Sequence, residues 1–134
     1  MAKPATILVE ISSGELIDKI TILEIKAERI ADARKLANVR YALDRLSETG
    51  AATLAMCPEL KRLWADLKAV NEALWEIEDD IRLCETEQDF GPRFIELARA
   101  VYRTNDRRAA IKTEIDQLLG SAMTDEKSYQ HYGA

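Results

Sequence analysis

The chain has 134 residues, of which 47% are hydrophobic and 32% charged, and it contains five glycines and three prolines. These figures fit one domain over residues 1–134, exclude a disordered chain and disfavour a turn-rich sandwich or barrel, so we expect a few long helices. The formal net charge of −5 opposes general attraction to nucleic acid or to an anionic membrane. No apolar stretch approaches the length of a membrane span. We therefore expect a soluble cytoplasmic protein with no cofactor, no nucleic-acid partner and no membrane partner.

The first predicted elements are a short strand and a long helix. Ile7, Val9 and Ile11 occupy alternate positions and would share one face, which predicts a strand over residues 6–11. Ser12 and Glu15 have the spacing of a capping box, which marks a helix start. This helix is predicted over about residues 13–48, because no helix breaker precedes the Thr-Gly pair at 49–50.

Two further helices are predicted over about residues 58–86 and 92–119, followed by a tail over 120–134. A proline suits the first turn of each of these helices. The first of them carries apolar residues at the heptad spacing that is typical of coiled coils. The chain is therefore predicted to be all-α, an elongated antiparallel bundle of three helices with a short N-terminal strand.

The helix predicted over residues 13–48 carries apolar side chains on two opposite faces. Ile20 belongs to one face and Ile25 to the other, at 100° per residue. One three-helix unit covers only one of these faces, so the sequence predicts a homodimer with this helix at its centre. The alternative is a bend near Arg34 that turns the second half of the helix back onto its own bundle.

Polar residues interrupt the apolar face of the third predicted helix. Helical projection places Asn105, Arg108 and Lys112 among the core positions. An unpaired buried charge is costly, so these side chains must be paired, hydrated or facing a cavity. One interpretation is an internal salt-bridge network in which Glu78 and Glu85 supply the counter-charges. The other is a cationic pocket for a carboxylate or phosphate ligand.

In the pocket interpretation, Arg108 and Lys112 bind the anion and Glu78 serves as an acid or base. The acid-rich stretch over residues 72–89 has the composition of a metal cluster, but most of its side chains are expected to face solvent, so no metal site is predicted. The full set of candidate ligand-binding residues is Asn105, Arg108, Lys112, Tyr102, Glu78 and Arg34.

No motif of known catalytic chemistry is present in the sequence. This favours a non-catalytic module for assembly or interaction that forms a homo-oligomer. The alternative function is a protein that binds, or an enzyme that acts on, a small anionic ligand such as a carboxylate, a phosphate or a nucleotide sugar.

Four stretches of the sequence together resemble a known family. They are residues 14–26, 74–79, 98–108 and 126–129, which read GELIDKITILEIK, LWEIED, ARAVYRTNDRR and EKSY. In these stretches the chain is similar to a family of short, all-helical bacterial proteins that is catalogued as a domain of unknown function. The resemblance covers nearly the whole chain, and it implies no activity.

Overall fold

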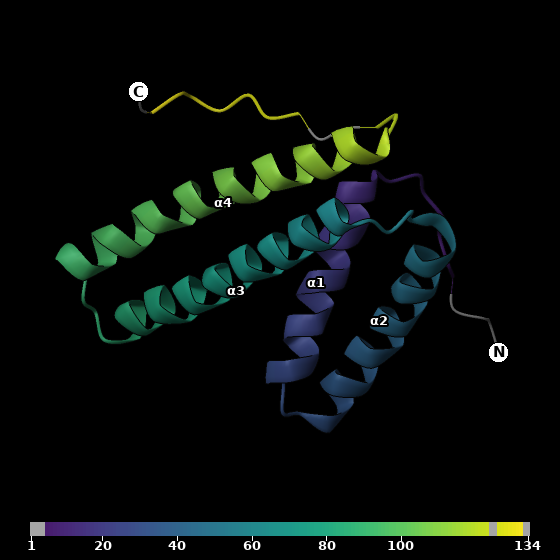
Figure 1. Ribbon diagram of the computed structural model, residues 1–134. Coiled ribbons are helices and arrows are strands. Elements are labelled where there is room, and N and C mark those ends of the chain that lie inside the picture. Colours follow the sequence, from purple (N-terminus) through teal and green to yellow (C-terminus); the bar gives the residue numbers. More distant parts are fainter. Residues whose placement is uncertain (1–4, 124–125, 133–134) are drawn as a thin grey trace.

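The computed structural model describes residues 5–123 and 126–132, and the regular structure in these residues is entirely helical. The helices are α1 (Ser13–Arg29), α2 (Ala33–Thr53), α3 (Pro58–Thr86) and α4 (Pro92–Leu119). Figure 1 shows two helical hairpins, of which α1–α2 lies across the end of α3–α4 where α3 begins and α4 ends. The all-α prediction is confirmed. The predicted three-helix bundle is wrong, because the first long helix is divided in two.

The division lies between Arg29 and Ala33. Ile30 takes an extended backbone with ψ of 127°, and the side chain of Asp32 caps α2 by accepting a hydrogen bond from the Lys35 amide at 2.9 Å. The predicted alternative of a bend near Arg34 is therefore close to the observed break. The predicted helix end at 49–50 is wrong, because α2 continues to Thr53 and buries Gly50.

The N-terminal segment, residues 5–11, is not a strand. No described segment of the chain pairs with it, and a single strand cannot satisfy its own backbone hydrogen bonds. The predicted strand over 6–11 is therefore wrong within this chain. Three successive apolar side chains in the segment are largely exposed, Ile7 at 83%, Leu8 at 90% and Val9 at 73%.

The hydrophobic core lies where α1 crosses α3 and α4. Its central side chains are at most 2% exposed and comprise Ile17, Leu60, Leu63, Leu67 and Ile115. Because α1 contacts the other three helices, both of its apolar faces are covered within one chain, with Ile20 and Ile25 buried. The double apolar stripe therefore gives no support for a dimer centred on this helix, and the homodimer itself stays a prediction.

The helices α3 and α4 begin and end at the predicted residues. Cys57 caps α3 by accepting a hydrogen bond from the Leu60 amide to its sulfur at 3.4 Å. After α4, Gly120 adopts a left-handed backbone with φ of 65°, which suits glycine at a helix end. Among the described helices, none is long and apolar enough to cross a membrane.

Candidate functional site

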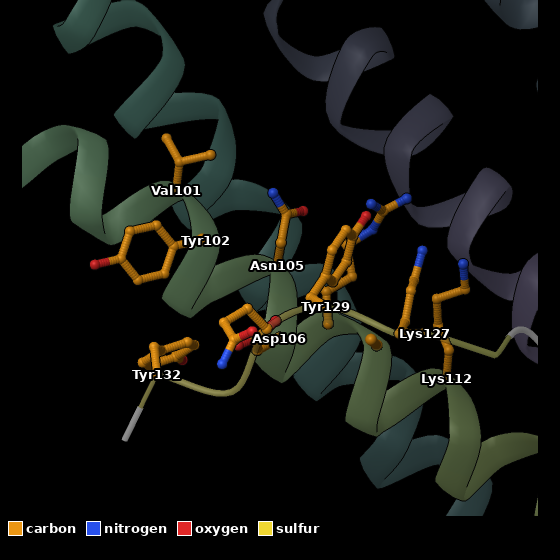
Figure 2. A pocket seen from close by; sticks show the side chains of 11 residues that line it. Val101, Tyr102, Asn105, Asp106, Lys112, Lys127, Tyr129 and Tyr132 are labelled. Carbon is orange, nitrogen blue, oxygen red and sulfur yellow. The ribbon is translucent and has the colours of Figure 1, made fainter.

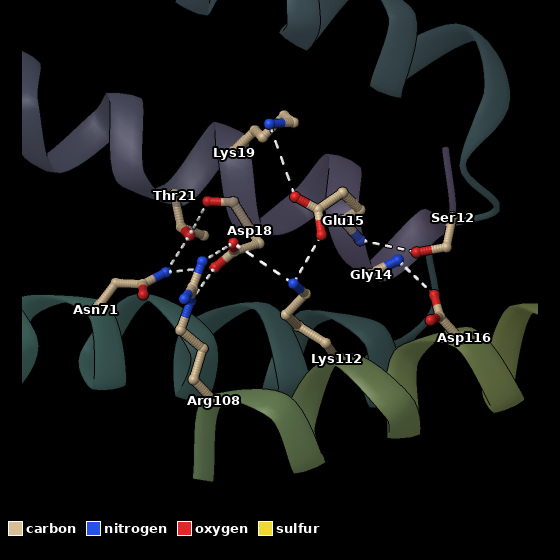
Figure 3. Close-up of polar contacts among 10 residues, drawn as sticks. All are labelled: Ser12, Gly14, Glu15, Asp18, Lys19, Thr21, Asn71, Arg108, Lys112 and Asp116. Carbon is tan, nitrogen blue, oxygen red and sulfur yellow. Dashed lines mark hydrogen bonds and ion pairs between the residues drawn. The ribbon is translucent and has the colours of Figure 1, made fainter. Parts of the chain in front are cut away.

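A cluster of polar side chains joins α1 to α3 and α4, and we call it the polar junction (Figure 3). Asp18 of α1 lies at its centre and is 1% exposed. Arg108 of α4 donates to both carboxylate oxygens of Asp18, with Nε at 2.9 Å from Oδ1 and Nη2 on Oδ2. The members of the junction are Glu15, Asp18, Thr21, Asn71, Arg108 and Lys112.

The remaining contacts of the junction come from α3 and from the next turn of α4. The Asn71 amide donates at 2.9 Å to Asp18 Oδ1 and at 3.0 Å to the hydroxyl of Thr21. Lys112 Nζ donates at 2.7 Å to Glu15 Oε2 and lies 3.9 Å from Asp18 Oδ2. Every described carboxylate, amide and cation of the junction therefore has a partner, and the junction sets the register between α1 and α4.

The electrostatics of the junction favour an ionised Asp18. Burial alone raises the pKa of the Asp18 carboxyl. Hydrogen bonds from Arg108 and Asn71, together with the positive charges of Arg108 and Lys112, outweigh that effect and bring the pKa below its ordinary value. Asp18 is therefore charged at neutral pH, and it holds the guanidinium of Arg108 in a fixed position.

A cavity of about 660 Å³ lies between α4 and the extended C-terminal segment, residues 126–132 (Figure 2). We call it the C-terminal cavity. Its α4 wall carries Arg108 and Lys112 of the polar junction, and the C-terminal segment contributes Lys127. The complete lining is Val101, Tyr102, Asn105, Asp106, Arg108, Ala109, Lys112, Lys127, Tyr129, Gln130 and Tyr132.

The C-terminal cavity has a cationic end and an aromatic end. Lys112 and Lys127 extend in the same direction at one end, while Tyr102 and Tyr132 lie at the other (Figure 2). The rings of Tyr102 and Tyr132 meet edge to face with centroids 5.1 Å apart. A hydrogen bond to Asp106, aided by partial burial, raises the pKa of the Tyr132 phenol. The aromatic contact and this hydrogen bond hold the C-terminal segment against α4.

A second cavity, of about 530 Å³, lies in the corner where α1 crosses α3 and α4, and we call it the corner cavity. Its apolar lining comes from α1 and α3, and Glu78, Asp79 and Arg82 add charge. Asn105 and Arg108 line both cavities.

The structure brings together four of the six predicted site residues. Asn105, Arg108, Lys112 and Tyr102 line the C-terminal cavity, whereas Glu78 lines the corner cavity. Arg34 is exposed on α2 and lines neither of these two cavities. The sequence prediction grouped Arg34 with the other site residues because it assumed one unbroken helix over residues 13–48. The break before α2 separates Arg34 from them.

The predicted counter-charges are wrong. Arg108 pairs with Asp18 of α1, and the ion pair described for Glu78 is with Arg82 on its own helix, at 3.4 Å. Sequence periodicity held a signal for Asp18, because Gly14, Asp18 and Ile25 share one face of α1 and burial of Ile25 implies burial of Asp18. Arg108 and Lys112 are paired with carboxylates of α1 and also line a cavity, while binding of an anion there stays a prediction.

Sequence reasoning also missed the residues that the C-terminal segment supplies. Lys127, Tyr129 and Tyr132 lie in a stretch without periodicity, so no pattern indicated which way they face. Within residues 5–123 and 126–132, the His, Cys, Asp and Glu side chains form no group of three or more that could hold a metal ion.

The comparisons with known proteins agree with the resemblance noted in the sequence. No curated protein and no solved structure matches the chain at a significant level. One family model matches residues 7–132, which include the polar junction and the lining of both cavities. The expected membership of an uncharacterised family is therefore confirmed: the chain belongs to DUF6165, a family of unknown function.

Proposed function

We propose that this protein binds a small anionic ligand, a carboxylate or a phosphate, in the C-terminal cavity. The observation that carries the proposal is that Arg108, Lys112 and Lys127 all line that cavity, from two separate elements. Guanidinium and ammonium groups are the side chains that proteins use most often to bind carboxylate and phosphate oxygens. The proposal is one of binding and assigns no reaction.

The polar junction supports this function by fixing two of the three cations before a ligand arrives. Arg108 is held by Asp18 and Lys112 by Glu15, and the two side chains are 29% and 9% exposed. Side chains that are already ordered lose little conformational freedom on binding, which favours affinity. The exposed Lys127 comes from the C-terminal segment and adds the third positive charge.

The size and the aromatic end of the cavity indicate the body of the ligand. A volume of about 660 Å³ falls within the range of small-molecule sites. Tyr102, Tyr129 and Tyr132 present aromatic rings that are 43%, 78% and 59% exposed, and covering them would release water from apolar surface. A ligand with an anionic group and a planar or apolar body fits both ends.

Calorimetric titration with inorganic phosphate and with benzoate tests the proposal. Lys127→Gln is expected to weaken binding about tenfold, because it removes one charge-assisted hydrogen bond. Lys61→Gln is the matched control, because Lys61 is exposed on α3 and lines neither cavity. Absence of binding to the wild-type protein, or an equal loss in both variants, would contradict a specific anion site.

We propose self-association through the N-terminal segment as a second role. The supporting observations are the exposure of Ile7, Leu8 and Val9 and the placement of Ile7, Val9 and Ile11 at alternate positions, as on one face of a strand. Two identical strands pair antiparallel about a two-fold axis, so a second copy of this chain is the partner that the segment fits. This role replaces α1 as the site of the predicted homodimer.

A further inference from the structure

We propose that the corner cavity is a second arm of the anion site, so that the ligand has an anionic centre with a neutral apolar or ring group on each side. A phosphate diester with two ring substituents has this chemistry. The inference rests on the proposed function, because it extends the ligand that the C-terminal cavity binds.

Arg108 lies between the two cavities. Its guanidinium is held on Asp18, and its side chain lines both the C-terminal cavity and the corner cavity. Asn105, one turn earlier on α4, also lines both cavities and is exposed. An anion at Arg108 therefore has an accessible cavity on either side of it.

The corner cavity has accessible apolar surface in its lining. Ile22, Leu74 and Trp75 are half-buried there, so part of their apolar surface is accessible, and Ile25 lies fully buried behind them. Apolar surface beside a cation suits the uncharged part of an anionic ligand, because its burial is favourable and needs no polar partner.

The corner cavity also carries charged side chains from α3. Glu78 and Asp79 supply two carboxylates, and Arg82 lies 3.4 Å from Glu78. The carboxylates disfavour a second anionic group in this arm, because like charges repel. The charges therefore place the single anionic centre at Arg108 and a neutral group in the corner.

Three probes test the inference: inorganic phosphate, phenyl phosphate and diphenyl phosphate. At about pH 5, where both aryl phosphates are mainly monoanions because the second pKa of a monoester is about 6, we expect diphenyl phosphate to bind about tenfold more tightly than phenyl phosphate, as burial of one additional ring predicts. Trp75 is an internal reporter of the corner cavity. In a Trp64→Phe protein, whose replaced side chain lines neither cavity, we expect Trp75 emission to change with diphenyl phosphate and not with inorganic phosphate.

Matched variants test whether the higher affinity for diphenyl phosphate comes from the corner cavity. Leu74→Ala is expected to abolish the preference for the diester, while Leu83→Ala leaves it unchanged, because Leu83 lies on the same helix, is 49% exposed and lines neither cavity. Ile22→Ala, on α1, is the second test if Leu74→Ala fails to fold.

The outcomes separate this inference from the proposed function. One outcome is that inorganic phosphate and phenyl phosphate bind while diphenyl phosphate binds no more tightly than phenyl phosphate and Trp75 emission stays constant. In that case the second arm is wrong and the anion site stands. If both Leu74→Ala and Ile22→Ala still bind diphenyl phosphate more tightly than phenyl phosphate, the second arm is also overturned, because the additional ring would lie elsewhere. If none of the three probes binds, the proposed function fails and the second arm fails with it.

Discussion

Gly14 lies at the closest approach of α1 to α4. A Cβ atom at this position would lie 2.6 Å from the backbone oxygen of Lys112 and 2.9 Å from Asp116 Oδ1. The Gly14 amide also donates a hydrogen bond to Asp116 Oδ1 at 2.7 Å. This hydrogen bond joins α1 to α4 at the point where their backbones lie closest. Only glycine fits here without moving the backbone of α4.

We therefore expect Gly14→Ala to lower the free energy of unfolding by about 1 to 3 kcal/mol, as overpacking does. Gly50→Ala is the control. A Cβ atom at Gly50 would meet the ends of two flexible side chains at 3.4 Å, and alanine favours a helix interior by up to about 1 kcal/mol. Urea denaturation of both variants measures the difference. Equal effects of the two substitutions would contradict the close approach.

The low pKa of Asp18 predicts a dependence of stability on pH. Since the pKa in the folded protein is below the ordinary value of 3.8, the ionised carboxyl contributes stability above about pH 4. This contribution is lost as the pH falls from there through the folded value. The difference in unfolding free energy between the wild-type protein and Asp18→Asn should therefore narrow below about pH 4. A difference that stays constant or widens in acid would contradict an ionised Asp18.

At the scale of the helices, Arg108 is the side chain that ties α4 to α1. Arg108→Ala leaves the buried carboxylate of Asp18 without its bidentate partner, and breaking such a pair costs about 3 kcal/mol or more. Arg103→Ala is the matched control, because Arg103 makes a 3.6 Å pair with Glu96 at the surface of α4 and should change stability by no more than about 0.5 kcal/mol. Thermal unfolding of both variants measures these effects, and equal losses would show that the polar junction does not stabilise the fold.

The sequence was sufficient to predict α3 and α4 and insufficient to predict the break between α1 and α2. Prolines at the first turn mark the start of both helices, an unbroken apolar period marks α3, and Gly120 marks the end of α4. The break has no glycine or proline, and its signal is the single capping residue Asp32, which is preceded and followed by alanine. Local propensity is weak there, so the packing of both hairpins decides where the helix ends.

The candidate site was predictable where its residues share one helix. Asn105, Arg108 and Lys112 follow the period of α4, so projection alone groups them. The ion-pair partners of Arg108 and Lys112 come from α1, at sequence separations of 90 and 97 residues, and the C-terminal segment supplies the other wall of the cavity. Such pairings depend on how the helices are arranged, and no local pattern contains that information.

At the scale of the whole molecule, the crossing of two hairpins explains why the C-terminal cavity and the corner cavity both adjoin Arg108. The α1–α2 hairpin covers only the end of α3–α4, which leaves a corner between α1 and the rest of the longer hairpin (Figure 1). The C-terminal segment returns along α4 and forms the other cavity. The antiparallel three-helix bundle that the sequence predicted has no crossing of two hairpins, and therefore no corner of this kind.

The homodimer prediction also belongs to this scale. We expect Ile7→Glu to shift the protein from dimer to monomer without loss of helicity, because Ile7 is 83% exposed within one chain. Ile25→Glu should instead lower the melting temperature steeply, since Ile25 is 1% exposed in the monomer. Light scattering and circular dichroism distinguish the two effects. A wild-type protein that is monomeric at all concentrations would contradict self-association.

The central claim is that an anion binds between α4 and the C-terminal segment, and amide chemical-shift mapping by NMR tests it most directly. On titration with phenyl phosphate, the account predicts saturable shifts concentrated in residues 101–112 of α4 and 127–132 of the C-terminal segment, the elements that line the C-terminal cavity. Amides of α2, which lines neither cavity, should stay in place. The contradicting result is an unchanged spectrum, or shifts scattered over exposed lysines and arginines throughout the chain.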